Sequence, residues 1–106
     1  MKKGHFSEHW TTDDGMPSGG ISTGTGFTIS WQNGPLGTGN ARRLPNGAFV
    51  EDVLDAVIGR IAFYQTTIFA CGENARALMA LHQAAEALDA RTRERVARQV
   101  EGTHSI

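Results

Sequence analysis

The spacing of the apolar residues changes near residue 48, and this change constrains the fold more than any other feature. Beyond that point the apolar side chains recur every three or four residues, at Val50, Val53, Leu54, Val57, Ile58, Ile61 and Tyr64. This spacing is typical of one face of an α-helix. A second helical segment runs from about Glu73 to Gln99 and would be roughly 40 Å long. A chain of 106 residues is too short to cover two such helices, so we expect a homo-oligomer.

The first half of the chain has a different composition, since ten of the thirteen glycines lie before residue 48. Residues 1–26 are polar and rich in Gly, Ser and Thr, which predicts a flexible N-terminal arm. From Phe27 to Trp31 apolar and polar residues alternate, as in a half-buried strand. We expect a small β region over residues 27–47 and a helical hairpin domain over 48–106. The predicted fold class is α+β, with a small N-terminal antiparallel sheet followed by a long antiparallel two-helix hairpin.

Charge and hydropathy exclude several classes of function. Ten Lys and Arg against eleven Asp and Glu give a net charge of −1, which disfavours a general nucleic-acid binder. No apolar run approaches the ~18 residues of a membrane span, and no apolar signal core follows Lys2 and Lys3. Cys71 is the single cysteine and cannot form an internal disulfide. These features predict a soluble protein of a reducing cytoplasm.

Arginines gather near the end of the second helical segment. Arg91, Arg95 and Arg98 follow one another by four and three residues, which places three guanidinium groups on one stripe. Guanidinium groups bind phosphate oxygens in pairs and stay charged at any working pH. The alternative is that these cations only complement the negative end of the helix. The spacing leaves both interpretations open.

A second candidate lies where the second helical segment begins, around residues 69–74. The first N–H groups of a helix have no partner within the helix and attract anions. Asn74 offers a carboxamide for a base or ribose edge, and Phe69 offers a flat ring for stacking. Alternatively, Phe69 belongs to the core and Asn74 only caps the helix.

The end of the predicted strand carries an aromatic residue followed by two amides, namely Trp31, Gln32 and Asn33. This order suits recognition of a base edge, although a tryptophan in a small protein is also a common core or interface residue. No sequence argument places a histidine beside Cys71 as a general base for catalysis. No pair of carboxylates has a recognisable catalytic spacing. We therefore expect no catalytic residue, no metal ligand and no cofactor.

Three segments together resemble a known family. They read GFTISWQNGPLG, PNGAFVEDVLDAVIGRIAFYQ and FACGENARALMALHQAAEALDARTRERVARQVEGTHSI. The chain resembles the phage Thoeris anti-defence proteins, with the hairpin domain shared with anti-CBASS sponges, over about residues 27–104. The most specific parts are NGAFVEDV, the ENxxAL segment and the ending RTRERVARQVEGTH.

The resemblance implies a function based on binding alone. Members of this family are not enzymes. They sequester cyclic ADP-ribose isomers made by TIR-domain proteins, and some members also bind cyclic trinucleotides made by CBASS cyclases. They act in the cytoplasm of the infected bacterium and assemble as homodimers that associate further into hexamers. We expect the same ligands and the same assembly here, with no nucleic-acid or membrane partner.

The resemblance also implies a set of binding residues. Phe69 and Asn74 match the segment between the helices, and the arginines at 91 and 95 match the C-terminal arginines of the family. Arg42 or Arg43 would stand in for a basic loop residue of the trinucleotide site. Gly72 replaces an arginine of many members, which leaves the preferred signal open. The expected ligand-binding residues are Trp31, Gln32, Asn33, Arg43, Phe69, Asn74, Arg91 and Arg95.

Two other functions remain as alternatives. A small phage protein of this kind could inhibit a host protein by docking its alanine-rich helix on it. A regulator could instead place the arginine stripe in a nucleic-acid groove, which the net charge of −1 disfavours.

Overall fold

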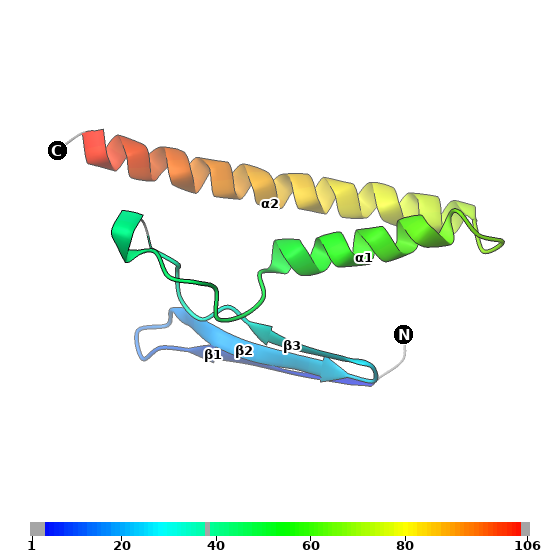
Figure 1. Ribbon diagram of the computed structural model, residues 1–106, viewed down its shortest axis with the longest axis horizontal. Coiled ribbons are helices and arrows are strands. Elements are labelled where there is room, and N and C mark those ends of the chain that lie inside the picture. Colours follow the sequence, from blue (N-terminus) through cyan, green and yellow to red (C-terminus); the bar gives the residue numbers. More distant parts are fainter. Residues whose placement is uncertain (1–3, 38, 105–106) are drawn as a thin grey trace. The chain divides into compact units, whose positions relative to one another are not determined.

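A computed structural model describes residues 4–37 and 39–104 and shows a three-stranded sheet followed by two helices (Figure 1). The elements are β1 (His5–Thr11), β2 (Pro17–Gly24), β3 (Phe27–Trp31), the short 3₁₀ helix η1 (Gly39–Ala41), α1 (Val50–Tyr64) and α2 (Gly72–His104). The chain divides into two compact units, Met1–Val50 and Glu51–Ile106. The predicted order of a small antiparallel sheet followed by two helices is confirmed.

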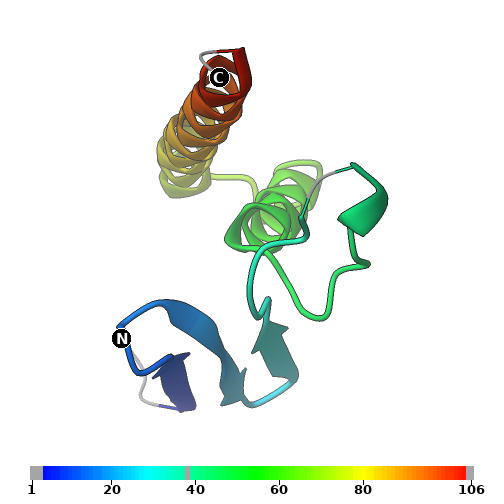
Figure 2. The same ribbon diagram turned by 90° about the vertical axis from the view of Figure 1, so that its left-hand side faces the viewer.

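The segment predicted as a flexible arm contains two strands instead. β1 and β2 form an antiparallel pair, and β2 lies between β1 and β3 (Figure 2). Residues 1–3 of the expected arm, like residues 105–106 of the expected hairpin domain, lie outside the described residues. The boundary expected after residue 26 therefore falls inside one sheet, two residues after β2 ends at Gly24.

One glycine of β2 makes room for the backbone of β1, because a Cβ atom on Gly20 would collide with the Glu8 carbonyl oxygen, and another makes room for an aromatic ring of β3. Gly20 pairs with Trp31 and Gly24 with Phe27 across the two strands. A Cβ atom on Gly24 would lie only 2.9 Å from the ring atom Cζ of Phe27. Aromatic side chains that cover strand glycines in this way compensate for the packing that glycine lacks. The composition of β2 resembles a linker, but its pairing partners make it a strand.

Hydrogen bonds, rather than apolar packing, hold the centre of the sheet. Among the residues whose burial is described, no hydrophobic side chain is buried, and Ser22 is the one buried polar residue. The Ser22 hydroxyl accepts the indole N–H of Trp31 at 2.9 Å and lies 2.8 Å from the Ser7 hydroxyl. This contact joins all three strands.

The segment after β3 follows the sheet without forming another strand. The N–H of Gln32 donates to the carbonyl of Ala48 at 2.9 Å, and the N–H of Ala48 donates to the carbonyl of Ser30 at 2.7 Å. Residues 41–44 form no return strand between them, since Ala41 ends η1 and residues 42–44 have no regular structure. Pro45 has no N–H with which to continue a ladder of hydrogen bonds.

The turn between the helices is tied by side chains. The Gln65 carboxamide accepts the N–H of Cys71 at 3.0 Å and donates to its carbonyl at 3.1 Å. The chain then reverses, so that α2 runs back in the opposite direction to α1 (Figure 1). Beyond the turn, an ion pair of 3.7 Å joins Arg91 of α2 to Glu51 at the start of α1. An exposed pair of this kind contributes about 0–1 kcal/mol.

The apolar side chains of the helices remain open to solvent in the single chain. Met79 is 66% exposed and Val96 54% exposed, and neither helix buries a residue in the part of the chain whose burial is described. No helix in the described ranges is long and apolar enough to span a membrane.

The central contact of the sheet gives the first prediction. Replacing Ser22 by Ala leaves the half-buried indole N–H of Trp31 without its acceptor, so we expect the free energy of unfolding to fall by about 0.5–1.5 kcal/mol. Urea denaturation followed by tryptophan fluorescence measures this change.

The matched control is Thr28→Ala, which removes an exposed hydroxyl that bonds to Thr23 in the same sheet. We expect the control to change stability by less than about 0.5 kcal/mol. Equal effects of the two substitutions would show that the Ser22 hydroxyl has no special role.

Candidate functional site

A cavity of about 440 Å³ lies at the turn between the helices. It is lined by Tyr64, Phe69, Cys71 and Asn74, and its volume falls in the range of small-molecule sites. Phe69 is 70% exposed, so the alternative that this ring belongs to the core of the chain does not hold. The structure therefore brings together two of the residues expected to bind ligand, Phe69 and Asn74.

Local hydrogen bonds set the positions of these two residues. The Thr67 hydroxyl donates to the carbonyl of Tyr64 at 2.6 Å and accepts the N–H of Phe69 at 3.1 Å. The Asn74 amide Nδ2 donates to the carbonyl of Phe69 at 3.3 Å. Its oxygen Oδ1 has no hydrogen-bond partner among the residues described. The arrangement leaves a flat ring and an amide acceptor facing one hollow.

Tyr64 belongs to this cavity and was not among the residues expected from sequence. The Arg60 guanidinium carbon lies 5.0 Å from the centre of the Tyr64 ring, and its Nε donates to the Tyr64 hydroxyl at 3.2 Å. Cation–π contact of this kind orients an aromatic ring. The helical spacing had assigned Tyr64 to the apolar face of α1. Its position as the last residue of that face, directly before the turn, is the signal that would have identified it.

The arginines lie far from this cavity within one chain. Arg91 follows Asn74 by seventeen positions in α2, which corresponds to about 25 Å along a helix. Arg91 is half exposed and pairs with Glu51, while Arg95 is exposed and has no ion pair among the described side chains. One chain by itself does not combine the ring, the amide and the two guanidinium groups.

At the end of β3, the Gln32 carboxamide forms hydrogen bonds with the backbone of the neighbouring loop. Its oxygen accepts the N–H groups of Asn46 at 2.9 Å and Gly47 at 3.1 Å, and its nitrogen donates to the carbonyl of Gly34 at 3.0 Å. Arg43 donates from Nη2 to the carbonyl of Pro35 at 2.7 Å. Both side chains stabilise the loop that runs from β3 to α1.

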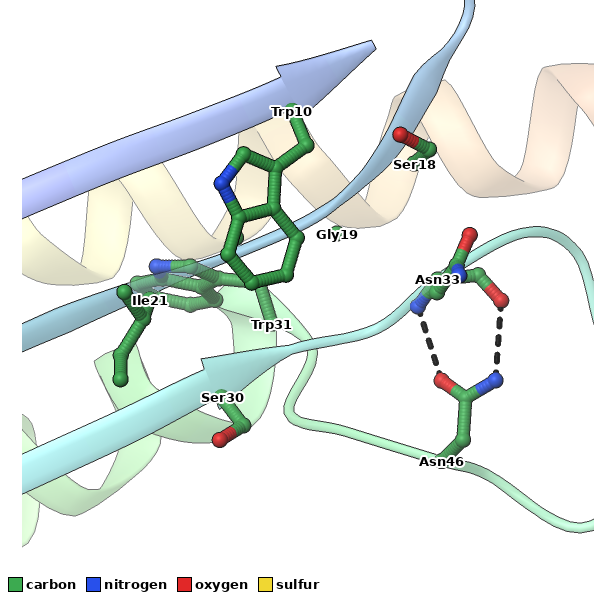
Figure 3. A pocket seen from close by; sticks show the side chains of 9 residues that line it. Trp10, Ser18, Gly19, Ile21, Ser30, Trp31, Asn33 and Asn46 are labelled. Carbon is green, nitrogen blue, oxygen red and sulfur yellow. Dashed lines mark hydrogen bonds between the residues drawn. The ribbon is translucent and has the colours of Figure 1, made fainter. Parts of the chain in front are cut away.

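A second cavity, of about 330 Å³, lies on the sheet unit (Figure 3). The expected residues Trp31 and Asn33 line it together with Trp10, Ile21, Ser30 and Asn46. The backbone of Asn33 pairs twice with the Asn46 side chain, donating to Oδ1 at 2.8 Å and accepting from Nδ2 at 3.0 Å. Composition gave no signal for Trp10, because its strand had been assigned to a flexible arm.

The described ranges contain few other side chains that could form a reactive or metal-binding site. Cys71 is a free, exposed thiol. No group of three or more His, Cys, Asp or Glu side chains in the described part of the chain lies close enough together to hold a metal ion.

The fold places the chain in the class of small α+β proteins in which an N-terminal antiparallel sheet precedes two helices. The chain matches no model of a known protein family. It is a homologue of Thoeris anti-defense 1 of Bacillus phage SBSphiJ7, to which it is 42% identical over 77 residues. The match covers 73% of this chain and 51% of the phage protein, so the chain spans about half the length of this relative. The resemblance to Thoeris anti-defence proteins inferred from the sequence motifs is thereby confirmed.

The bonds of Gln32 give a prediction that needs no ligand. Replacing Gln32 by Ala removes the acceptor of the Asn46 and Gly47 N–H groups, so we expect hydrogen exchange at these two amides to accelerate by about tenfold or more. Exchange measured by NMR tests this expectation. Exchange at Ala48, whose N–H bonds to Ser30, should change less. Unchanged exchange at Asn46 and Gly47 would contradict the role in the loop.

Proposed function

We propose that the chain counteracts Thoeris defence by binding a cyclic ADP-ribose signal in the cytoplasm of an infected bacterium and holding it intact. The homology to Thoeris anti-defense 1 carries this proposal. It is supported by the exposed ring and amide of the cavity at the helical turn, since both groups suit a nucleotide. The protein acts as a sponge and catalyses no reaction on the signal.

Each group of the cavity has a role in the proposed complex. The Phe69 ring stacks against the base, and Asn74 Oδ1, which lacks a partner in the described structure, accepts a hydrogen bond from a base or ribose donor. The Tyr64 hydroxyl accepts from Arg60 and keeps its own proton to donate. These contacts favour a ligand that is flat at one end and carries hydroxyl groups.

The phosphates of the signal need cations, and we propose that a second copy of the chain supplies them. A two-fold axis between hairpins places the turn of one copy beside Arg91 and Arg95 of the other. The same pairing covers apolar side chains that one chain leaves exposed, such as Met79. The proposed active unit is therefore a homodimer with two equivalent sites, and further association leads to a hexamer.

Sequestration depends on affinity alone. Each tenfold decrease of the dissociation constant requires about 1.4 kcal/mol. A hydrogen bond to a charged group contributes about 1.5–3 kcal/mol. Two arginines on the phosphates of one signal molecule therefore account for a large part of the binding free energy.

Cyclic trinucleotides of CBASS systems form a second proposed ligand class. The expected contact is Arg43, whose Nη2 already donates to Pro35 and whose remaining N–H groups can reach a phosphate. Calorimetry with a cyclic trinucleotide and the Arg43→Ala variant tests this part separately.

The helical site predicts the behaviour of two variants. We expect Asn74→Ala and Arg91→Ala each to raise the dissociation constant for a cyclic ADP-ribose isomer by at least about tenfold. Arg93→Ala is the matched control, because Arg93 is an exposed arginine on a different stripe of the same helix. Calorimetry measures the affinity, and heating the complex followed by mass spectrometry checks that the signal is released unchanged. Wild-type affinity in both variants, or a cleaved product, would refute the proposed site.

Mixing these two variants tests whether the site lies between copies. A mixed dimer of Asn74→Ala and Arg91→Ala copies has one site with both residues intact. After random exchange we expect about a quarter of the wild-type binding capacity to return. If each site belonged to a single chain, mixing would restore no binding.

An inhibitor of a host protein is the second candidate function. The exposed apolar residues of α2, Met79 and Val96, favour this alternative because such surfaces bind protein partners. Isolation of a stoichiometric host protein, with no small molecule released on heating, would support it over the sponge.

A further inference from the structure

The cavity on the sheet unit has well-defined walls, and the proposed sponge function assigns no ligand to it. The Trp10 indole, 47% exposed, forms one side of it, and Ile21 and Ser30, which face each other across β2 and β3, form another (Figure 3). Gly19 lies between these sides with a φ of +97°. A Cβ atom there would lie 3.4 Å from Asn33 Cβ and 3.6 Å from Trp10 Cε3. The hollow therefore depends on the missing side chain of Gly19.

Polar groups that line this cavity are not engaged by the protein. The side chain of Asn33 and the hydroxyls of Ser18 and Ser30 make no hydrogen bond within the described part of the chain. The Asn33 carboxamide is turned away from the Asn46 side chain, which pairs with the Asn33 backbone (Figure 3). A carboxamide presents one acceptor and two donors in a plane. Such a group matches the edge of a planar heterocycle.

The charge of the surroundings selects against an anion. None of the nine residues that line the cavity is charged. The Trp10 indole N–H donates to the Glu8 carboxylate at 2.7 Å, which holds the ring in place and sets a negative charge beside it. Among the described residues that line the cavity, none offers a cation to a phosphate, which Glu8 also repels.

We propose that this cavity is a separate binding site for an uncharged heteroaromatic ring of the nucleobase type. The ring stacks on the Trp10 indole, and its polar edge bonds to the Asn33 carboxamide. A volume of about 330 Å³ suits a base or a nucleoside better than a cyclic trinucleotide. The proposal does not depend on the function of the helical site.

Adenosine is the probe, and NMR of ¹⁵N-labelled protein is the measurement. The chain has two tryptophans, so two indole N–H signals are expected, and Trp10→Phe identifies the one from Trp10. We expect adenosine to shift the Trp10 indole signal and the Asn33 carboxamide signals in a saturable way. AMP should bind at least about threefold more weakly, because its phosphate is repelled by Glu8. Glu8→Gln should reduce that difference.

Asn33→Ala tests the polar contact without disturbing the fold, since the backbone of Asn33 makes the bonds to Asn46. We expect this variant to weaken adenosine binding by about fivefold or more. Asn40→Ala, an exposed asparagine outside the cavity, is the matched control and should bind as the wild type does.

Three results would overturn the proposal. The first is the absence of a saturable shift. The second is unchanged adenosine affinity in both Trp10→Phe and Asn33→Ala. The third is a shift of the Trp10 signal with protein concentration alone, which would mean that a second copy covers this face. The Asn74→Ala protein should bind adenosine at the sheet as the wild type does, so failure of the sponge proposal and failure of this one are distinguishable.

Discussion

The uncovered apolar faces of the helices are the constraint on which the rest of the structure depends. A single helix in water is marginal, and most of its stability in proteins comes from covering its apolar side. No hydrophobic side chain is buried among the residues whose burial is described. Each square ångström of apolar surface removed from water contributes about 25 cal/mol. We propose that assembly with another copy supplies the stability that the single chain lacks, and that the same event completes the ligand site.

Amide side chains in this protein divide into those that build the structure and those that remain available. Gln32 and Gln65 use their carboxamides to tie loops, at residues 46–47 and at Cys71. The Asn33 side chain and Asn74 Oδ1 have no protein partner among the described groups. An amide that is hydrogen-bonded within the protein must break those bonds before it can bind a ligand. The unbonded amides of Asn33 and Asn74 therefore indicate binding sites better than those of Gln32 and Gln65.

Part of the fold was predictable because it depends on local spacing. Helix α1 begins and ends at the residues that the apolar period marked, and β3 coincides with the alternating segment 27–31. β1 and β2 were not predicted, because both lie in a stretch rich in Gly, Ser and Thr, whose composition is typical of a linker. Their conformation depends on pairing with neighbouring strands, such as Phe27 of β3 opposite Gly24, a contact that no local pattern contains. Of the residues that line the two cavities, Phe69 and Asn74 were predictable together because they lie only five positions apart in the sequence. Tyr64 and Trp10 were not predicted.

The sequence by itself determined where the helices lie and to which known protein this chain is related. Only the tertiary structure decided which polar groups are engaged and which face a cavity. The physical reason is that helical periodicity is a property of neighbouring residues. Hydrogen bonds such as that between Gln32 and Gly47 join residues distant in sequence and form only once the chain has folded.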